Sequence, residues 1–178
     1  LIPLLNESGA EWKRIESPIQ EIIGKGENGS AEFKSSLRWD YENKRVNKDL
    51  EYTVARSISG FMNANGGCVL IGVSPFGEIL GLAKDYSTLG KEKKDRDGFE
   101  LQLTEVINRY IGKEFRKFIK VAFEIVDERD ICHVEIRKSS RPNFISKNGQ
   151  KEFHIRSGNR TQTLNIEEAT KYIKMHWK

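Results

Sequence analysis

The sequence predicts an α+β domain, with a mixed or antiparallel sheet built largely of hairpins and about four helices packed on it. Apolar residues at three- and four-residue spacing indicate amphipathic helices, and alternating apolar and polar residues indicate half-buried strands. Short turns separate several of these strands. Hairpin-paired strands covered by helices are typical of α+β domains rather than doubly wound sheets.

The first elements lie close to the start of the predicted domain. Residues 17–23 are expected to form a short helix, with Ser17 as N-cap and Pro18 as the first helical residue. Residues 31–37 alternate between apolar and polar side chains, the period of a half-buried strand. The polar residues 38–49 are then expected to form an exposed connection.

A longer helix is predicted over residues 49–62, because its apolar residues fall on one stripe: Leu50, Val54, Ile58, Phe61 and Met62. Asn and Gly in residues 63–67 end this helix, since both accept the left-handed backbone of a helix C-cap. Residues 69–73 are apolar without alternation, which favours a central strand buried on both faces.

Turn residues at 74–77 lead into an expected returning strand at 78–82, and charged residues 84–97 are expected to form a loop. A second helix is predicted from Phe99 to Tyr110 by its apolar spacing. The remaining expected elements are a hairpin of strands 119–125 and 132–136, short strands near 144–145 and 153–156, and a final helix over 166–177 with Asn165 as N-cap.

The composition is that of a globular domain with a mild positive bias. Among 178 residues, 37% are hydrophobic and 31% charged, and the formal net charge is +4. Positive potential attracts polyanions, although alone it also fits a solvated basic surface.

No apolar run approaches the roughly 20 residues that span a bilayer, so no membrane partner is expected. Cys68 and Cys132 lie in apolar runs without zinc-site spacing, which predicts buried free thiols and a cytoplasmic, reducing location.

The chain begins at Leu1 rather than Met, which indicates a piece of a larger protein. Residues 1–16 are expected to be a linker or N-terminal extension, and residues 17–178 to form the domain.

Two acidic residues form a candidate catalytic and metal-binding pair. Glu27 lies in a Gly-flanked turn and Glu32 near the start of the predicted strand 31–37, so both carboxylates can reach one divalent ion. Mg²⁺ prefers carboxylate oxygens, water and substrate phosphate. Mg²⁺ or Mn²⁺ bound there would orient water for phosphodiester cleavage. The alternative is an ordinary acidic pair on a surface rich in carboxylates.

Basic residues near this strand are candidate nucleic-acid contacts. Lys34 shares the strand face of Glu32, and Arg38 follows it beside Trp39 and Tyr41. Cations interleaved with aromatics suit a phosphate backbone and an unstacked base. The basic character continues in two further candidates, Lys44 and Arg45. The alternative is a solvated charged loop with Trp39 folded onto the core.

Two Gly-containing turns supply the remaining candidates. Asn65, Gly66 and Gly67 either only stop a helix or also let backbone amides approach a phosphate. Arg156 and Arg160 flank a polar turn and either contact phosphates through their planar forks or, for Arg156, form a structural salt bridge. The scattered histidines are expected to be structural.

Together, these segments resemble the Schlafen AlbA-type (AlbA_2) domains, described as DNA-binding. They occur in the family's order between about Ile19 and Tyr172. The matching segments are Gly26-Glu27, Ala31-Glu32-Phe33-Lys34-Ser35-Ser36-Leu37, Leu50-Glu51, and residues 61–73, 77–82, 139–142 and 153–161.

The resemblance implies a nucleic-acid-binding domain, found alone or fused to other modules. Some Schlafen proteins are metal-dependent endoribonucleases that cut tRNA and rRNA with two Glu five residues apart and a later Asp. Glu27 and Glu32 match that pair. Asn65 stands where relatives often have the Asp, so the carboxylate triad is incomplete unless Asp40 or Asp49 substitutes.

Three functions are therefore open. The first is a domain that binds DNA or RNA mainly through phosphates and needs no cofactor. Such a domain is expected to be part of a larger protein, either a regulatory protein such as a transcriptional regulator or a defence protein. The second is a Mg²⁺- or Mn²⁺-dependent endoribonuclease that uses Glu27 and Glu32. The third is a protein-interaction or dimerisation module, and the resemblance favours a homodimer.

Overall fold

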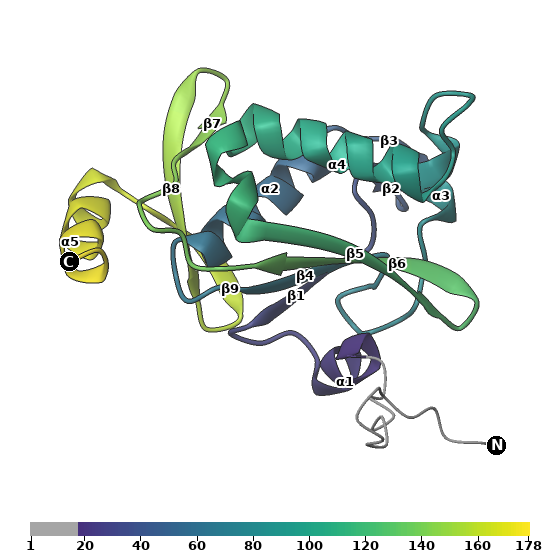
Figure 1. Ribbon diagram of the computed structural model, residues 1–178, viewed down its shortest axis with the longest axis horizontal. Coiled ribbons are helices and arrows are strands. Elements are labelled where there is room, and N and C mark those ends of the chain that lie inside the picture. The colour runs from purple at the N-terminus through teal and green to yellow at the C-terminus, as the bar shows by residue number, and fades with distance from the viewer. Residues whose placement is uncertain (1–17) are drawn as a thin grey trace, which may run out of the picture.

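The computed structural model describes residues 18–178, which form two main sheets with helices between and around them (Figure 1). The first sheet is mixed, in the order β1-β4-β6-β5, with β1 and β4 parallel and the other pairs antiparallel. The second sheet is antiparallel, in the order β7-β8-β9. The strands are β1 Ala31–Lys34, β4 Gly67–Ile71, β5 Ile119–Val126, β6 Arg129–Ile136, β7 Ile145–Lys147, β8 Gln150–Ser157 and β9 Arg160–Leu164.

Helix α2 is central, because it contacts strands of both sheets as well as helix α4. The larger core lies between α2, α4 and the first sheet. A smaller core lies on the other face of that sheet, where Ile19 of α1 packs with Phe33 and Leu70. The helices are α1 Pro18–Lys25, α2 Asp49–Met62, α3 Ala83–Ser87, α4 Arg96–Tyr110, the 3₁₀ helix η1 Lys113–Phe118 and α5 Ile166–His176.

The α+β class is correct, and several elements match their predicted bounds. Helix 49–62 begins and ends as expected, and Asn165 caps α5 in a capping box with Glu168. The β5–β6 hairpin turns at Asp127 and Glu128, whose φ angles of 48° and 61° suit a two-residue turn. Cys68 and Cys132 are free and buried. The expected N-cap Ser17 and extension 1–16 lie outside the described residues.

Other predicted elements are wrong. The expected strand at 78–82 is reduced to a single bridge between Val73 and Ile79, because the chain bends at Gly77 and Gly81, which both have positive φ. The strand expected over 31–37 ends at Lys34.

Two charged segments that were expected to be irregular contain helices or strands. The supposed loop 84–97 contains most of α3 and the start of α4, and the connection 38–49 contains a small hairpin of β2 Trp39–Asp40 and β3 Arg45–Val46. Strand β9 and helix η1 were not expected, so the described helices outnumber the four predicted. Within residues 18–178, no helix is long and apolar enough to cross a membrane.

A buried amide pair ties α2 to the second sheet. Asn63, at the end of α2, donates from Nδ2 to the carbonyls of Asn143 and His154, at 2.8 and 2.9 Å. The backbone N–H of Asn143 donates back to Asn63 Oδ1 at 2.8 Å. Both asparagines are fully buried, so every polar group in this bridge depends on its partner.

Asn63→Ala is expected to lower the free energy of unfolding by about 3 kcal/mol, because it leaves one N–H and two carbonyls buried without partners. Urea unfolding followed by circular dichroism measures the change. Asn159→Ala, at an exposed turn position, is the control and should change stability by less than about 0.5 kcal/mol. Equal effects of the two substitutions would contradict this role of Asn63.

Candidate nucleic-acid interface

Strand β1 places Glu32 and Lys34 on the face toward α2, while Phe33 faces the smaller core. The Glu32 carboxylate accepts hydrogen bonds from Lys34 and Arg156, and from Ser57 of α2 at 2.9 Å. Both carboxylate oxygens are therefore occupied, one by Lys34 and Ser57 and the other by Arg156.

Arg156 has a structural role, the alternative that the sequence left open. It is only 7% exposed, and its Nη2 atom donates to the carbonyls of Asn28 at 2.7 Å and Ala31 at 3.2 Å. Its Cζ atom lies 4.7 Å from the ring centroid of Phe61. The guanidinium thus joins β8 to β1 and to the turn before it, and it is buried against protein groups.

The pKa of Glu32 reflects this pairing. Burial alone would raise it, but the charges of Lys34 and Arg156 and the hydrogen bonds from Lys34 and Ser57 lower the pKa below its ordinary value. Glu32 is consequently an ionised carboxylate held by two cations.

The candidate residues lie near opposite ends of β1 rather than on one surface. Because β1 and β4 are parallel, Asn65, Gly66 and Gly67 lie at the end where Ala31 pairs with Cys68. The β8–β9 turn reaches the same end, since the position of a Cβ on Gly29 would lie 3.7 Å from the Gly158 carbonyl oxygen. This first group also includes Glu27 and Arg160.

The second group lies beyond the other end of β1 and consists of Arg38, Lys44 and Arg45, with Lys34 as the last strand residue.

Packing accounts for both glycines. A Cβ on Gly66 would lie 2.6 Å from the carbonyl oxygen of Ile136, and one on Gly67 would lie 2.6 Å from the ring of Phe61 and from the Ser30 carbonyl oxygen. Both also have positive φ, 76° and 150°. The backbone at these positions approaches protein atoms that leave no room for a side chain.

Arg38 contributes to a buried ionic group. Its Nε atom lies 3.6 Å from Glu51 Oε1, and Arg109 of α4 lies 3.7 Å from the other oxygen of Glu51. Gln102 donates to Glu51 Oε1 at 2.9 Å. Since the Arg38 side chain is only 15% exposed, its main contact is with Glu51.

A hollow lined by the aromatic residues Trp39 and Tyr41 lies beside the β2–β3 hairpin and is here named the Trp39 hollow. Its volume is about 310 Å³, and it is lined by Phe33, Lys34, Ser35, Ser36, Trp39, Asp40, Tyr41, Leu50, Thr53 and Pro75. The Nζ atom of Lys84 lies 5.5 Å from the Trp39 ring centroid. Lys44 and Arg45 are exposed in the hairpin next to it.

Asp85 fixes the backbone that leads into this hollow. Its carboxylate accepts the N–H groups of Leu37 and Arg38 at 3.0 and 2.9 Å. Burial raises the pKa of Asp85, and the backbone hydrogen bonds oppose that rise. No local pattern indicates this role, because Asp85 lies 48 positions from Leu37 in a charged segment that was expected to be a loop.

The sequence profile of the family described as "Schlafen, AlbA_2" matches residues 27–165, most of the chain. The chain belongs to the Schlafen AlbA_2 family. This membership associates the chain with nucleic acids and agrees with the ordered segments identified in the sequence.

A solved structure supports the fold of this AlbA_2 domain. The DIP2311 protein from Corynebacterium diphtheriae is similar, with a TM-score of 0.59 and 14% sequence identity over 90% of this chain. The matched region is 32% of the DIP2311 chain, so the domain spans about a third of that protein. Among curated proteins, no sequence matches this chain.

The metal site implied by nuclease members of the Schlafen family does not fit the observed contacts. Glu27 Oε1 accepts the N–H of Phe33 at 2.8 Å, and Glu32 is neutralised by Lys34 and Arg156. Asn65 is exposed and brings no charge. Across residues 18–178, no group of three or more His, Cys, Asp or Glu side chains is arranged to hold a metal ion.

A polar network that the sequence did not reveal surrounds His154. The Nε2 atom of His154 lies 3.1 Å from Glu152 Oε2 and 3.3 Å from the Tyr52 hydroxyl. Thr163 and Arg56 approach the other ring nitrogen at 3.0 and 3.4 Å. Burial lowers the pKa of His154. The network links α2 to β8 and β9, which agrees with the structural role expected of the histidines.

Glu32→Gln is expected to lower the free energy of unfolding at pH 7 by about 3 kcal/mol, because it leaves Arg156 buried without its counter-charge. Glu27→Gln is the matched control, since glutamine can still accept the Phe33 N–H, and it should cost less than about 1 kcal/mol. Urea unfolding of both variants measures the difference. Wild-type stability in Glu32→Gln would exclude the proposed role of this pair.

The same pair predicts a pH dependence. Because the pKa of Glu32 is lower in the folded protein than in the unfolded chain, its stabilisation is full above pH of about 4.5 and is lost as the pH falls through the folded pKa. The stability difference between wild type and Glu32→Gln should therefore shrink below about pH 4.5. A difference that stays constant down to pH 3 would contradict this assignment.

Proposed function

We propose that this domain binds DNA or RNA mainly through phosphates, at the Trp39 hollow and the adjoining β2–β3 hairpin. The observation that carries the proposal is a cavity lined by Trp39 and Tyr41, with the Lys84 Nζ atom 5.5 Å from the Trp39 ring centroid, beside exposed basic residues of the hairpin. Phosphate contacts hold a nucleic acid in place, and an aromatic ring accepts a base whatever its sequence.

The cations that remain available belong to the hairpin and its flanks. Lys44, Arg45, Lys48 and Lys84 are exposed. Within the described residues, no salt bridge to a carboxylate engages any of the four. Each cation that neutralises a phosphate releases a counterion, so binding should weaken as salt increases.

Trp39 and Tyr41 supply the apolar part of the site. Tyr41 is 37% exposed, and Trp39 is half-buried at the start of the hairpin, fixed through the segment that Asp85 holds. Rings fixed in this way lose little conformational entropy when a base stacks on them. This arrangement favours weakly sequence-dependent binding.

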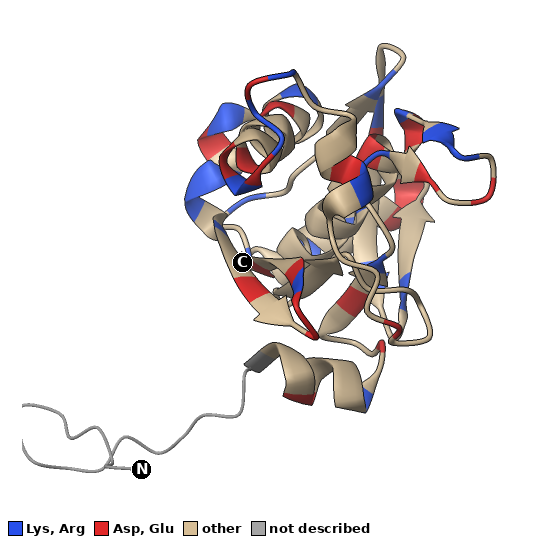
Figure 2. Cartoon of the chain, turned by 90° about the vertical axis from the view of Figure 1, so that its right-hand side faces the viewer, with Lys and Arg blue, Asp and Glu red and all other residues tan. Residues whose placement is uncertain are grey.

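Because charges of both signs are mixed over the chain, affinity for a nucleic acid must depend on local contacts. Figure 2 shows Lys and Arg interspersed with Asp and Glu over the chain rather than gathered into one large basic region. With a formal net charge of only +4, long-range attraction is modest. Affinity must therefore come from a few contacts at the Trp39 hollow.

Other expected functions are less well supported by the geometry. The nuclease requires Glu32 to exchange its cations for a metal ion, and it predicts Mn²⁺-dependent cutting of structured RNA that Glu32→Gln abolishes. A homodimer stays a prediction that light scattering can test. A place within a larger regulatory or defence protein stays a prediction.

Lys44→Ala/Arg45→Ala is expected to weaken binding to labelled tRNA and duplex DNA by roughly tenfold at 0.1 M salt, because two phosphate contacts are lost. The slope of log affinity against log salt concentration should fall in magnitude by about 1.8 for duplex DNA. Fluorescence anisotropy across a salt series measures both quantities, and the same mixtures with Mn²⁺ are scored for cleavage.

Lys171→Ala/Lys174→Ala on α5 removes the same charge at another exposed place and is the control. It should leave both the affinity and the salt slope close to those of wild type. Equal losses in the two double variants would show that net charge, not the hairpin, governs binding. A wild-type affinity that does not change across the salt series would refute the proposed function itself.

A further inference from the structure

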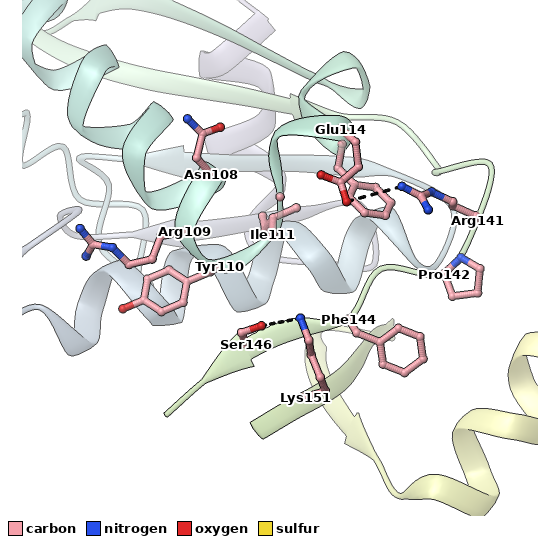
Figure 3. Close-up of a pocket in the computed structure, with 12 residues that line it drawn as sticks. Asn108, Arg109, Tyr110, Ile111, Glu114, Arg141, Pro142, Phe144, Ser146 and Lys151 are labelled. Carbon is pink, nitrogen blue, oxygen red and sulfur yellow. Dashed lines mark hydrogen bonds and ion pairs between the residues drawn. The ribbon is translucent and has the colours of Figure 1, made fainter. Parts of the chain in front are cut away.

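A second, larger cavity lies between the C-terminal end of α4 with η1 and the β7–β8 hairpin (Figure 3). Its volume is about 630 Å³, it is open rather than enclosed, and it shares no lining residue with the Trp39 hollow. Cavities of this size accommodate nucleotide-sized ligands. Neither the family resemblance nor the sequence motifs assigned it a role.

The lining of this cavity carries more cations than carboxylates. Arg109, Arg141 and Lys151 line it together with one carboxylate, Glu114, although Arg109 also lies 3.7 Å from the buried Glu51. Arg141 lies 3.5 Å from Glu114, but both side chains are more than half exposed, so the pair is weak and easily exchanged for a phosphate. Lys151 donates only to the Ser146 hydroxyl, at 2.6 Å, and keeps its charge available (Figure 3).

Aromatic rings line the same cavity. Phe144 is 42% exposed although its ring packs against Phe153, with a centroid distance of 5.0 Å. Tyr110 is held by an edge contact with Tyr52 at 5.5 Å. Exposed rings that are fixed by their neighbours are suited to stacking against a base.

We propose that this cavity binds an unpaired nucleotide of a single-stranded nucleic acid. The base stacks on Phe144 or Tyr110, and the adjoining phosphates contact Arg141 and Lys151. The rings suit a base and the cations suit phosphates, and the open cavity lets the strand pass on both sides. A fully paired duplex cannot place a base there, because its bases are stacked inside. The inference deepens the proposed function, on which it rests, by naming the form of nucleic acid recognised at a second site.

The test compares the full chain with Phe144→Leu, which removes the aromatic face but keeps an apolar contact with Phe153, and with Lys151→Ala at an exposed position. The probes are a labelled short single-stranded oligonucleotide and the blunt duplex formed with its complement, followed by fluorescence anisotropy. Each variant should weaken single-strand binding by about tenfold while changing duplex binding by less than about twofold. Lys44→Ala/Arg45→Ala should weaken the binding of both probes, and this difference distinguishes the Trp39 hollow from the larger cavity.

Three results would overturn the inference. The first is unchanged single-strand binding in both variants, the second is an equal loss of affinity for both probes, and the third is displacement of the strand by adenosine monophosphate at matched nucleotide concentration. The last result would assign the cavity to a free nucleotide instead. Failure of the wild-type chain to bind either probe would also refute the proposed function, whereas unchanged single-strand binding in the two cavity variants would leave the proposed function standing.

Discussion

The ion pair between Glu32 and Arg156 is the interaction on which the rest of the arrangement depends. It joins residues 124 positions apart and holds the second sheet against β1. Because Arg156 also donates to the backbone of the turn before β1, it sets the position of that turn. The same pairing neutralises the carboxylate that a metal-dependent mechanism would need, so one contact both stabilises the fold and directs the functional interpretation toward binding.

Buried polar groups around α2 position both cavities. Asp85 holds the chain that leads into the Trp39 hollow, and Asn63 ties α2 to the segment before β7, beside the larger cavity. Glu51 contacts Arg38 on one side and Arg109, which lines the larger cavity, on the other. Helix α2 therefore acts as a rigid support from which the two candidate nucleic-acid contacts are held.

Local patterns in the sequence were sufficient for much of the fold. Helix 49–62 and the β5–β6 hairpin follow from periodicity and turn residues, and the proximity of Lys34, Trp39 and Tyr41 follows from their nearness in the chain. The small elements inside charged segments were missed because contacts such as that of Asp85 with Leu37, not local propensity, stabilise them. The role of Arg156 was open for the same reason, since its partner is distant in sequence. The roles of Asp85 and His154, which have no motif around them, likewise needed the full structure to be noticed.

Phosphate binding at the Trp39 hollow can be followed residue by residue in a nuclear magnetic resonance titration of ¹⁵N-labelled protein with blunt duplex DNA. We expect the indole N–H resonance of Trp39 and the amide resonances of residues 40–46 to shift, while those of residues 167–175 in α5 stay in place. Complex formation that leaves Trp39 and this hairpin unshifted would contradict phosphate binding at the hollow.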